Sequence, residues 1–141
     1  DTPLEIFVDA IGLGAGVADR LRELGLPAYA INVGESPALG KHYLNLRAEL
    51  WYKAKAWLEA RDVRLPRDER LKTELVTVRY NYTSTGRVKI ESKADLKKRG
   101  VASPDSADAF VLTFASEAGT AIGGRAGRHR GKIRRDLAGI V

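Results

Sequence analysis

The feature that most constrains the fold is an apolar run at residues 4–8 that ends in Asp9 and precedes a glycine-rich turn. Short runs rich in β-branched and aromatic residues predict a buried strand. A helix is expected over about residues 17–24, and a second apolar run at 28–33 predicts another strand. The expected apolar face of that helix consists of Val17, Leu21 and Leu24. A strand–helix–strand order favours two parallel strands with a right-handed crossover, so the fold class is α/β.

The middle of the chain predicts helices followed by a β-hairpin. Apolar residues recur at helical spacing over 45–61, and a short helix is expected over 67–75. Apolar and polar residues alternate over 76–82 and again over 88–90. The Ser-Thr-Gly sequence at 84–86 lies between these runs and predicts the turn of a hairpin.

Two further helices are expected before the chain becomes rich in glycine and arginine. The first is a short basic helix over 94–99. The second should begin at Ser103 and Pro104, with the serine hydroxyl as the cap and the proline in the first turn, and run to about residue 116. Its apolar stripe is formed by Ala107, Phe110, Val111 and Phe114.

Length and charge predict one domain with a basic tail. The 141 residues suffice for a single sizeable core, and 24 Lys and Arg against 18 Asp and Glu give a net charge of +6. Residues 117–141 hold six basic and two acidic side chains, so four of the six net charges lie there. We therefore expect a domain at 1–116 and a flexible tail at 117–141. The tail either attracts a polyanion through counterion release or is a solvated segment that maintains solubility.

Features that are absent from the sequence exclude several classes of protein. The chain has no cysteine, which excludes disulfides, thiolate zinc sites and thiol chemistry and fits a reducing compartment. No apolar run approaches the length of a membrane span, and no signal-peptide pattern is present. Methionine is also absent, including at the start, so we expect a trimmed, processed or fragmentary chain.

Three acidic residues are the best candidates for chemistry. Asp9 ends a predicted strand, where α/β sheets place their ligands, although an aspartate there can instead cap the following turn. Asp105 and Asp108 are helix neighbours, and Asp108 lies closer to the apolar stripe. Acids in a first helical turn also complement the helix dipole, which explains Asp105 better than Asp108. Together the three carboxylates would suit Mg²⁺ or Mn²⁺, and two such ions can cleave a phosphodiester.

Basic and aromatic side chains suggest how a nucleic acid would be held. Lys93 lies between the hairpin and the last helix, where it could stabilise developing charge. The candidates to follow a phosphate backbone are Lys89, Lys93, Lys97, Lys98 and Arg99. Each of them can equally be a solvated surface charge. Trp51 and Trp57 are expected to pack in the helix, whereas Tyr80 and Tyr82 are the better candidates for base stacking.

A nucleotide-binding interpretation competes with the metal site. Gly12, Gly14 and Gly16 lie between a strand and a helix, but Val17 stands where a dinucleotide fingerprint needs its third glycine. Glu35 follows the second strand, about where a ribose ligand would be. A P-loop is absent, so no ATPase is expected in this chain. His42 and His129 are isolated and suggest neither a triad nor a zinc site.

Taken as a set, several stretches resemble one known family. They are Val8 to Asp19, Asn45 to Trp51, Ile90 to Lys93, Lys97 to Gly100, and Ser103 to Ala109. In this order they resemble the C-terminal nuclease domain of tailed-phage terminase large subunits, over roughly residues 4–116. The resemblance implies a ribonuclease H-like fold, a mixed sheet with flanking helices and an inserted hairpin beside a DNA groove.

The resemblance also implies a function and partners. Such a domain is a Mg²⁺- or Mn²⁺-dependent endonuclease that cuts concatemeric double-stranded DNA during head filling. Asp9 and an aspartate of the Ser-Pro-Asp segment would bind metal, and both Asp105 and Asp108 are carried as ligands with Lys93 beside them. The implied partners are the phage portal and the small terminase subunit, without a membrane, in the cytoplasm of an infected or lysogenic bacterium.

Two departures from the family pattern keep alternatives open. The family takes its first acidic residue from an earlier strand, which nothing before Asp1 supplies here, and the motor ATPase domain is missing. We therefore expect a nuclease that is incomplete or inactive alone, with a sheet edge that a homodimer or strand exchange would cover. The alternative is a non-enzymatic DNA- or capsid-binding prophage remnant, and a nucleotide-binding protein is the third hypothesis.

Overall fold

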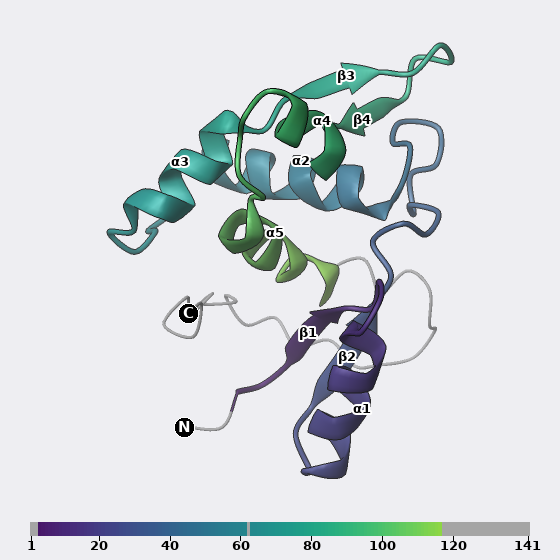
Figure 1. Ribbon diagram of the computed structural model, residues 1–141, viewed down its shortest axis with the longest axis vertical. Helices are drawn as coiled ribbons and strands as arrows, with labels where there is room; N and C mark the ends of the chain where they lie inside the picture. Colours follow the sequence, from purple (N-terminus) through teal and green to yellow (C-terminus); the bar gives the residue numbers. More distant parts are fainter. Residues whose placement is uncertain (1–2, 62, 117–141) are drawn as a thin grey trace.

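The computed structural model describes residues 3–61 and 63–116, so the expected tail at 117–141 lies outside the described residues. Helices and strands follow the order β1-α1-β2-α2-α3-β3-β4-α4-α5 (Figure 1). The first three elements, β1, α1 and β2, form one end of the structure, and α5 lies between them and α2 (Figure 1). This arrangement confirms an α/β chain and brings the start and the end of the described sequence together.

The first unit consists of β1 (Ile6–Asp9), α1 (Gly14–Glu23) and β2 (Ala28–Ile31). The two strands are parallel, with Ile6 opposite Ala28 and Asp9 opposite Ile31, as predicted. Of the expected apolar face of α1, Leu21 is half-buried, but the prediction is wrong for Val17 and Leu24. Val17 and Leu24 are 51% and 61% exposed, and Ala18 is the buried residue of the helix. A sheet of two strands is too narrow to cover the larger side chains, so α1 packs through its smallest one.

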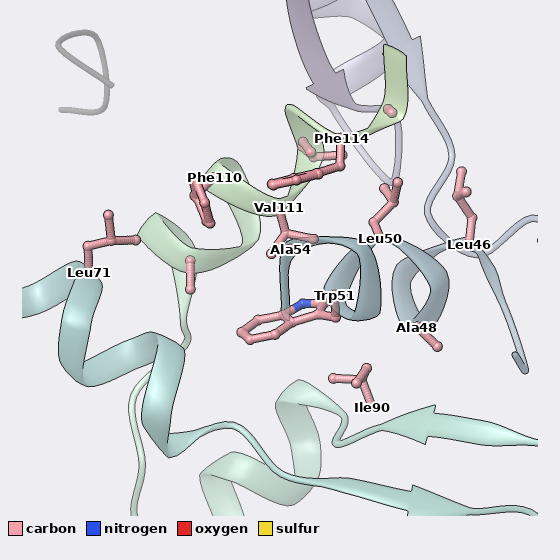
Figure 2. Packing of buried hydrophobic residues seen from close by; sticks show 13 residues of the cluster. Leu46, Ala48, Leu50, Trp51, Ala54, Leu71, Ile90, Phe110, Val111 and Phe114 are labelled. Carbon is pink, nitrogen blue, oxygen red and sulfur yellow. The ribbon is translucent and has the colours of Figure 1, made fainter. Parts of the chain in front are cut away.

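The hydrophobic core lies mainly between α2 (Leu46–Glu59) and α5 (Asp105–Leu112), with α3 (Glu69–Thr77) at one side (Figure 2). Trp57 packs its ring 5.9 Å from those of Phe110 and Phe114, and Trp51 is buried in the same cluster. Both tryptophans therefore pack in the core, as predicted. The start of α2 is fixed by Asn45, whose side chain accepts a hydrogen bond from the Ala48 N–H at 3.0 Å.

The hairpin pairs β3 (Tyr80–Tyr82) with β4 (Val88–Ile90) in antiparallel register, with Tyr80 opposite Ile90. The predicted first strand was too long, because α3 continues through residues 76 and 77. Glu74 explains the extension, since its carboxylate accepts a hydrogen bond from the Ala107 N–H at 2.9 Å and fixes the last turn of α3 against α5. Val76 then faces solvent at 78% exposure.

The strands do not join into the expected single mixed sheet. In residues 3–61 and 63–116 they form one parallel and one antiparallel sheet of two strands each. One isolated bridge between Tyr43 and Val88 connects the loop before α2 to the hairpin. The body of the fold between the two sheets is therefore helical, and α5 supplies the packing that a continuous sheet would otherwise provide.

The last two helices begin differently from each other. At α4 (Lys93–Lys98) the Ser92 side chain caps the helix by accepting from the Asp95 N–H. At α5 the expected serine cap is wrong, because Pro104 occupies the cap position. The Ser103 hydroxyl donates instead to the Asp105 carboxylate at 2.6 Å. As a cap the hydroxyl oxygen would accept from a backbone N–H, whereas here the hydroxyl donates to a charged acceptor, which makes a stronger hydrogen bond than a neutral one.

A paired acid anchors the hairpin to α4. Glu91 is 9% exposed, and both of its carboxylate oxygens accept hydrogen bonds from Arg99 at 2.7 Å. The same guanidinium donates to the Thr77 carbonyl at 3.1 Å, so it ties α4 to the end of α3. Arg99 thus links the end of α4 to the ends of β4 and α3.

A helix that could cross a bilayer is absent from the described ranges, where the longest helix, α2, has 14 residues.

The Glu91–Arg99 pair predicts a pH dependence of stability. Hydrogen bonding from Arg99, with a further bond from the Arg79 N–H, lowers the pKa of Glu91 below its ordinary value of 4.5. A lowered folded-state pKa means that the stabilisation is complete above that ordinary value and is lost as pH falls through the folded-state pKa. In urea denaturation from pH 6 to 2.5, Glu91→Gln should flatten the loss of stability at acid pH.

The matched control is Glu69→Gln, because the Glu69 side chain is 83% exposed in its contact with Lys72. That variant should keep the acid-side slope of the unsubstituted protein. Equal slopes for all three proteins would contradict the role assigned to the Glu91–Arg99 pair.

Candidate active site

A cavity of about 560 Å³ lies where β1, the start of α2, β4 and α5 meet. Asp9, Asp105 and Asp108 all line it, although about a hundred residues separate the first from the other two. The other polar lining residues are Asn45, Arg47, Lys89, Ser92 and Lys93. The fold therefore brings the three candidate acids and two of the candidate lysines to one place.

Asp108 is held by three hydrogen bonds to a single oxygen. Its Oδ1 accepts from Arg47 Nε at 3.1 Å, from Arg47 Nη2 at 2.9 Å and from Trp51 Nε1 at 3.0 Å. The Arg47 and Asp108 side chains are only 15% and 21% exposed. Arg47 also donates to the Glu91 carbonyl at 2.9 Å, which ties this pair to the end of β4. Because Oδ1 is fully engaged, Oδ2 is the oxygen of Asp108 left for other partners.

Asp105 is the more exposed of the two helix acids, with a side chain 62% accessible to solvent. The hydrogen bond from the Ser103 hydroxyl lowers the pKa of this carboxyl, and nearby Lys93 acts in the same direction against the opposing effect of burial. Asp105 is therefore a carboxylate at neutral pH.

Lys93 lies between the two acids of α5. Its ammonium nitrogen is 3.4 Å from Asp105 Oδ1 and 3.9 Å from Asp108 Oδ2. The two carboxylates thus converge on one cation at the mouth of the cavity. The Lys93 side chain is 58% exposed, so it can move without unpacking the core.

Asp9 is positioned by the end of β1 and the turn that follows. Its Oδ1 accepts a hydrogen bond from the Ile11 N–H at 3.1 Å, so Asp9 caps the turn as well as lining the cavity. Gly12 allows the turn because it has a φ of +73°. Gly14 packs so closely that a Cβ there would overlap the Asp9 carbonyl oxygen. Turn geometry and close packing account for these two glycines without a bound nucleotide.

The remaining basic candidates are distributed unevenly. Lys89 lines the cavity. Lys98 pairs with Asp95 at 3.3 Å, and Arg99 is engaged by Glu91. Lys97 is exposed and, like Lys98 and Arg99, does not line the cavity. Lys89 and Lys93 are therefore the cations best placed to meet a ligand in it.

Arg47 and Trp51 were not predicted as site residues. Their signal was present, because residues four apart share one face of a helix, and the two polar ends can therefore reach one acceptor. The acceptor lies 57 to 61 residues further along the chain, so only the tertiary fold shows the contact. The indication in the sequence was Arg47 itself, a basic residue on an otherwise apolar face of the helix.

The three acids do not form a compact metal cluster by themselves. In residues 3–61 and 63–116, no three His, Cys, Asp or Glu side chains lie close enough together to hold a metal ion. The site instead offers a convergent pair, Asp105 and Asp108, with Asp9 at another wall of the same cavity.

No protein-family model and no curated protein sequence matches the chain. Its fold is similar to that of solved structures of the nuclease domain of the large terminase subunit gp2 of bacterial virus Sf6, with a TM-score of 0.64 and 23% identity. That match covers 77% of this chain and 63% of the solved one. A lysine-to-alanine variant of the same domain, solved with manganese, matches at a TM-score of 0.64, 23% identity and 77% and 64% coverage. The predicted resemblance to a terminase nuclease domain is thus confirmed for the fold, and the chain spans less than two thirds of these domains.

Removal of Arg47 should destabilise the protein by leaving a largely buried charge without its main partner. We expect Arg47→Ala to lower the free energy of unfolding by about 3 kcal/mol, as for other broken buried pairs. Adding Asp108→Asn should recover part of the loss, because the amide needs no counter-charge. The control is Arg20→Ala, whose ion pair with Glu23 is 69% and 64% exposed and should change stability by less than about 1 kcal/mol. Similar losses for Arg47→Ala and Arg20→Ala in urea denaturation would contradict this assignment.

Two glycines on α1 offer a matched test of the Asp9 turn. Gly14→Ala should destabilise the protein by about 1–3 kcal/mol, since the added methyl overlaps the Asp9 carbonyl. Gly16→Ala should stabilise it by about 0.5–1 kcal/mol, because nothing lies within 4 Å of the new methyl group and alanine favours a helix. Urea denaturation measures both, and the same sign for the two variants would rule out the close approach.

Proposed function

We propose that this chain is a terminase-type nuclease domain that cleaves DNA phosphodiester bonds at the acidic cavity with divalent metal ions. The observation that carries the proposal is the convergence of Asp9, Asp105 and Asp108, from distant parts of the sequence, on one cavity. The similarity of the fold to a phage terminase nuclease domain supports the same reaction class. Some of the solved structures of that domain contain manganese or calcium, which fits a site for divalent cations.

The residues of the cavity fit such an ion. Asp105 and Asp108 already share the Lys93 ammonium between them, so the pair is arranged for positive charge. Carboxylate oxygens suit Mg²⁺ and Mn²⁺, and Mg²⁺ is commonly held by one or two protein carboxylates together with substrate phosphates and water. This mode of binding needs no preformed cluster of three acids. When bound, the ion supplies an activated water and polarises the phosphoryl oxygen.

Each side chain of the cavity has a role in this proposal. Asp108 is the principal ligand, because Arg47 and Trp51 fix its Oδ1 and leave Oδ2 for the ion. Asp9 binds from the wall formed by β1, and Asp105 assists from the exposed side. Lys93 leaves the acid pair and places its ammonium on a phosphate oxygen of the DNA.

The biological setting follows from the resemblance and is part of the proposal. The DNA would be the concatemeric double-stranded DNA of a tailed phage, cut during packaging in the cytoplasm of the host. The portal and the small terminase subunit would be the assembly partners. Since the described residues contain no preformed group of three acids for the ion, we expect weak activity.

A second candidate is a non-enzymatic DNA- or capsid-binding remnant of a prophage. The observation that favours it is the lack of a three-acid cluster in the described part of the chain. This candidate predicts binding of DNA without cleavage under any metal.

A plasmid-nicking assay decides between the two. With Mn²⁺ or Mg²⁺ we expect slow nicking of supercoiled plasmid that EDTA abolishes. Asp9→Asn and Asp108→Asn should reduce it to the EDTA background, whereas Asp105→Asn should leave a measurable fraction because that side chain is 62% exposed. The control is Asp19→Asn, an exposed acid that pairs with Arg22 and should cleave at the original rate.

Two outcomes would contradict the nuclease proposal. Nicking that survives in both Asp9→Asn and Asp108→Asn would assign the activity to a contaminant. If the protein slows the migration of the plasmid in a gel-shift assay but does not nick it with either metal, the DNA-binding remnant is favoured.

A further inference from the structure

A second cavity, of about 390 Å³, lies between α2, the end of α3 and β3 and has no part in the proposed active site. Its floor is apolar and includes Leu58, Leu75 and Val78. Tyr52 and Tyr80 line it together with two cations, Lys55 and Arg79. We call this cavity the tyrosine groove. Its volume lies within the range of about 300–1,000 Å³ that is usual for sites that bind small molecules.

Four of the five tyrosines form a continuous row, in which Tyr52 and Tyr80 line the groove and Tyr43 and Tyr82 extend the row at its two ends. The rings of Tyr43 and Tyr52 are 5.5 Å apart, those of Tyr52 and Tyr80 are 5.7 Å apart, and those of Tyr80 and Tyr82 are 5.9 Å apart. The half-buried part of the row, Tyr43 and Tyr52, attaches the hairpin to α2. The other end is free for a ligand, since Tyr80 and Tyr82 are 50% and 65% exposed.

The Tyr52 hydroxyl at the centre of the row is uncharged at neutral pH. Burial, together with the neighbouring tyrosines, raises the pKa of Tyr52 to about 12. A phosphate backbone near the groove would therefore meet no negative charge on Tyr52, and this hydroxyl stays available as a hydrogen-bond donor.

The surroundings of the groove are positively charged. Residues 78–100 contain seven Lys or Arg and only two acids, Glu91 and Asp95, each of which has a basic partner. Arg79, Arg87 and Lys89 have no ion-pair partner among the residues that the structure describes. Among the described residues, Glu59 is the one acid that lines the groove, and Lys55 pairs with it at 2.6 Å. The positive net charge of residues 78–100 therefore complements a polyanion.

The groove adjoins the acidic cavity, with two side chains between them. Ile90 lines both cavities. Trp51 lines the groove, while its indole N–H donates to Asp108 Oδ1 at 3.0 Å. Figure 2 shows these two residues facing each other at the lower side of the core. A polynucleotide bound in the acidic cavity would therefore lie close to the tyrosine groove.

We propose that the tyrosine groove binds unpaired bases of single-stranded DNA. The proposal deepens the nuclease function and rests on DNA being the substrate. Exposed aromatic rings flanked by cations are what single strands need, because every base has a face that can stack and every phosphate a charge. Base-paired DNA presents its bases edge-on and would not use the groove. The predicted consequence is that this protein prefers DNA that is locally melted or single-stranded.

The test measures binding apart from cleavage. The full 141-residue chain is titrated, in EDTA and 50 mM salt, against a fluorescent 12-nucleotide oligo(dT) and against a 12-base-pair duplex. Fluorescence anisotropy should give tighter binding to the single strand. Tyr82→Ala should weaken single-strand binding about fivefold or more, which is the smallest effect typical of a lost base stack. Tyr82→Phe should bind almost as the unsubstituted protein does.

Two further variants control for folding and for position. Tyr82→Thr places a β-branched residue, which favours a strand, in β3 and should weaken binding as the alanine variant does. A folding defect confined to Tyr82→Ala would therefore not decide the result. Tyr29→Ala removes the 46% exposed tyrosine of β2, away from the groove, and should leave binding unchanged.

The outcomes separate this inference from the nuclease proposal. Equal single-strand affinities for the unsubstituted protein, Tyr82→Ala and Tyr82→Thr would overturn it and assign the tyrosine row to packing alone, as would a preference for the duplex. Tyrosine-dependent binding of oligo(dT) supports it even when the plasmid is not nicked. Nicking without tyrosine-dependent binding leaves the nuclease proposal standing and removes this one.

Discussion

The contact between Arg47, Trp51 and Asp108 connects the two helices on which the fold depends. Trp51 packs in the core through its ring and reaches Asp108 through its nitrogen, so one residue serves both the core and the site. Arg47 extends the contact to the Glu91 carbonyl, and Glu91 in turn holds Arg99. A chain of charged hydrogen bonds thus runs from α5 through α2 to the hairpin and α4. Because an unpaired charge at this depth is costly, the chain of contacts fixes how these elements sit together.

The same contact distinguishes the two helix acids. Both lie in the first turn of α5, where a negative charge is favourable. Asp108 faces inward to Arg47 and Trp51, whereas Asp105 faces outward to Ser103 and Lys93. A ligand that enters the cavity therefore meets one fixed carboxylate and one that is free to adjust. Lys93 balances the pair while no other cation is present.

Much of the architecture was predictable from local patterns, because the local signals agree with the fold. Asn45 precedes a long amphipathic run, and it caps α2 in the structure. The parallel strands on either side of α1 and the antiparallel hairpin also follow from hydrophobic periodicity and turn residues. Val17 and Leu24 were misassigned because helical spacing shows which residues share a face, but not how wide the sheet beneath them is. Val76 was misassigned because a contact from Glu74 to a distant helix extends α3. The three candidate acids were predicted from strand-end and helix-start positions and line one cavity in the structure, whereas the contact of Arg47 with a residue 61 positions away could not be predicted.

The two-stranded sheet of β1 and β2 has a dynamic consequence. The Ile6 and Ala10 amides bond to the β2 side, so the amides of Phe7 and Asp9, which alternate with them, point to the other edge, where the described residues supply no third strand. A pair of strands with one small helix is marginal by itself, and several of its larger side chains face water. Opening events that cost little free energy should therefore begin in this unit, with its amide protons exchanging well before those of α2 and α5. Asp9 would leave the cavity during such an opening while the helical core stays closed, so warming would cost the site its third carboxylate before the protein as a whole unfolds.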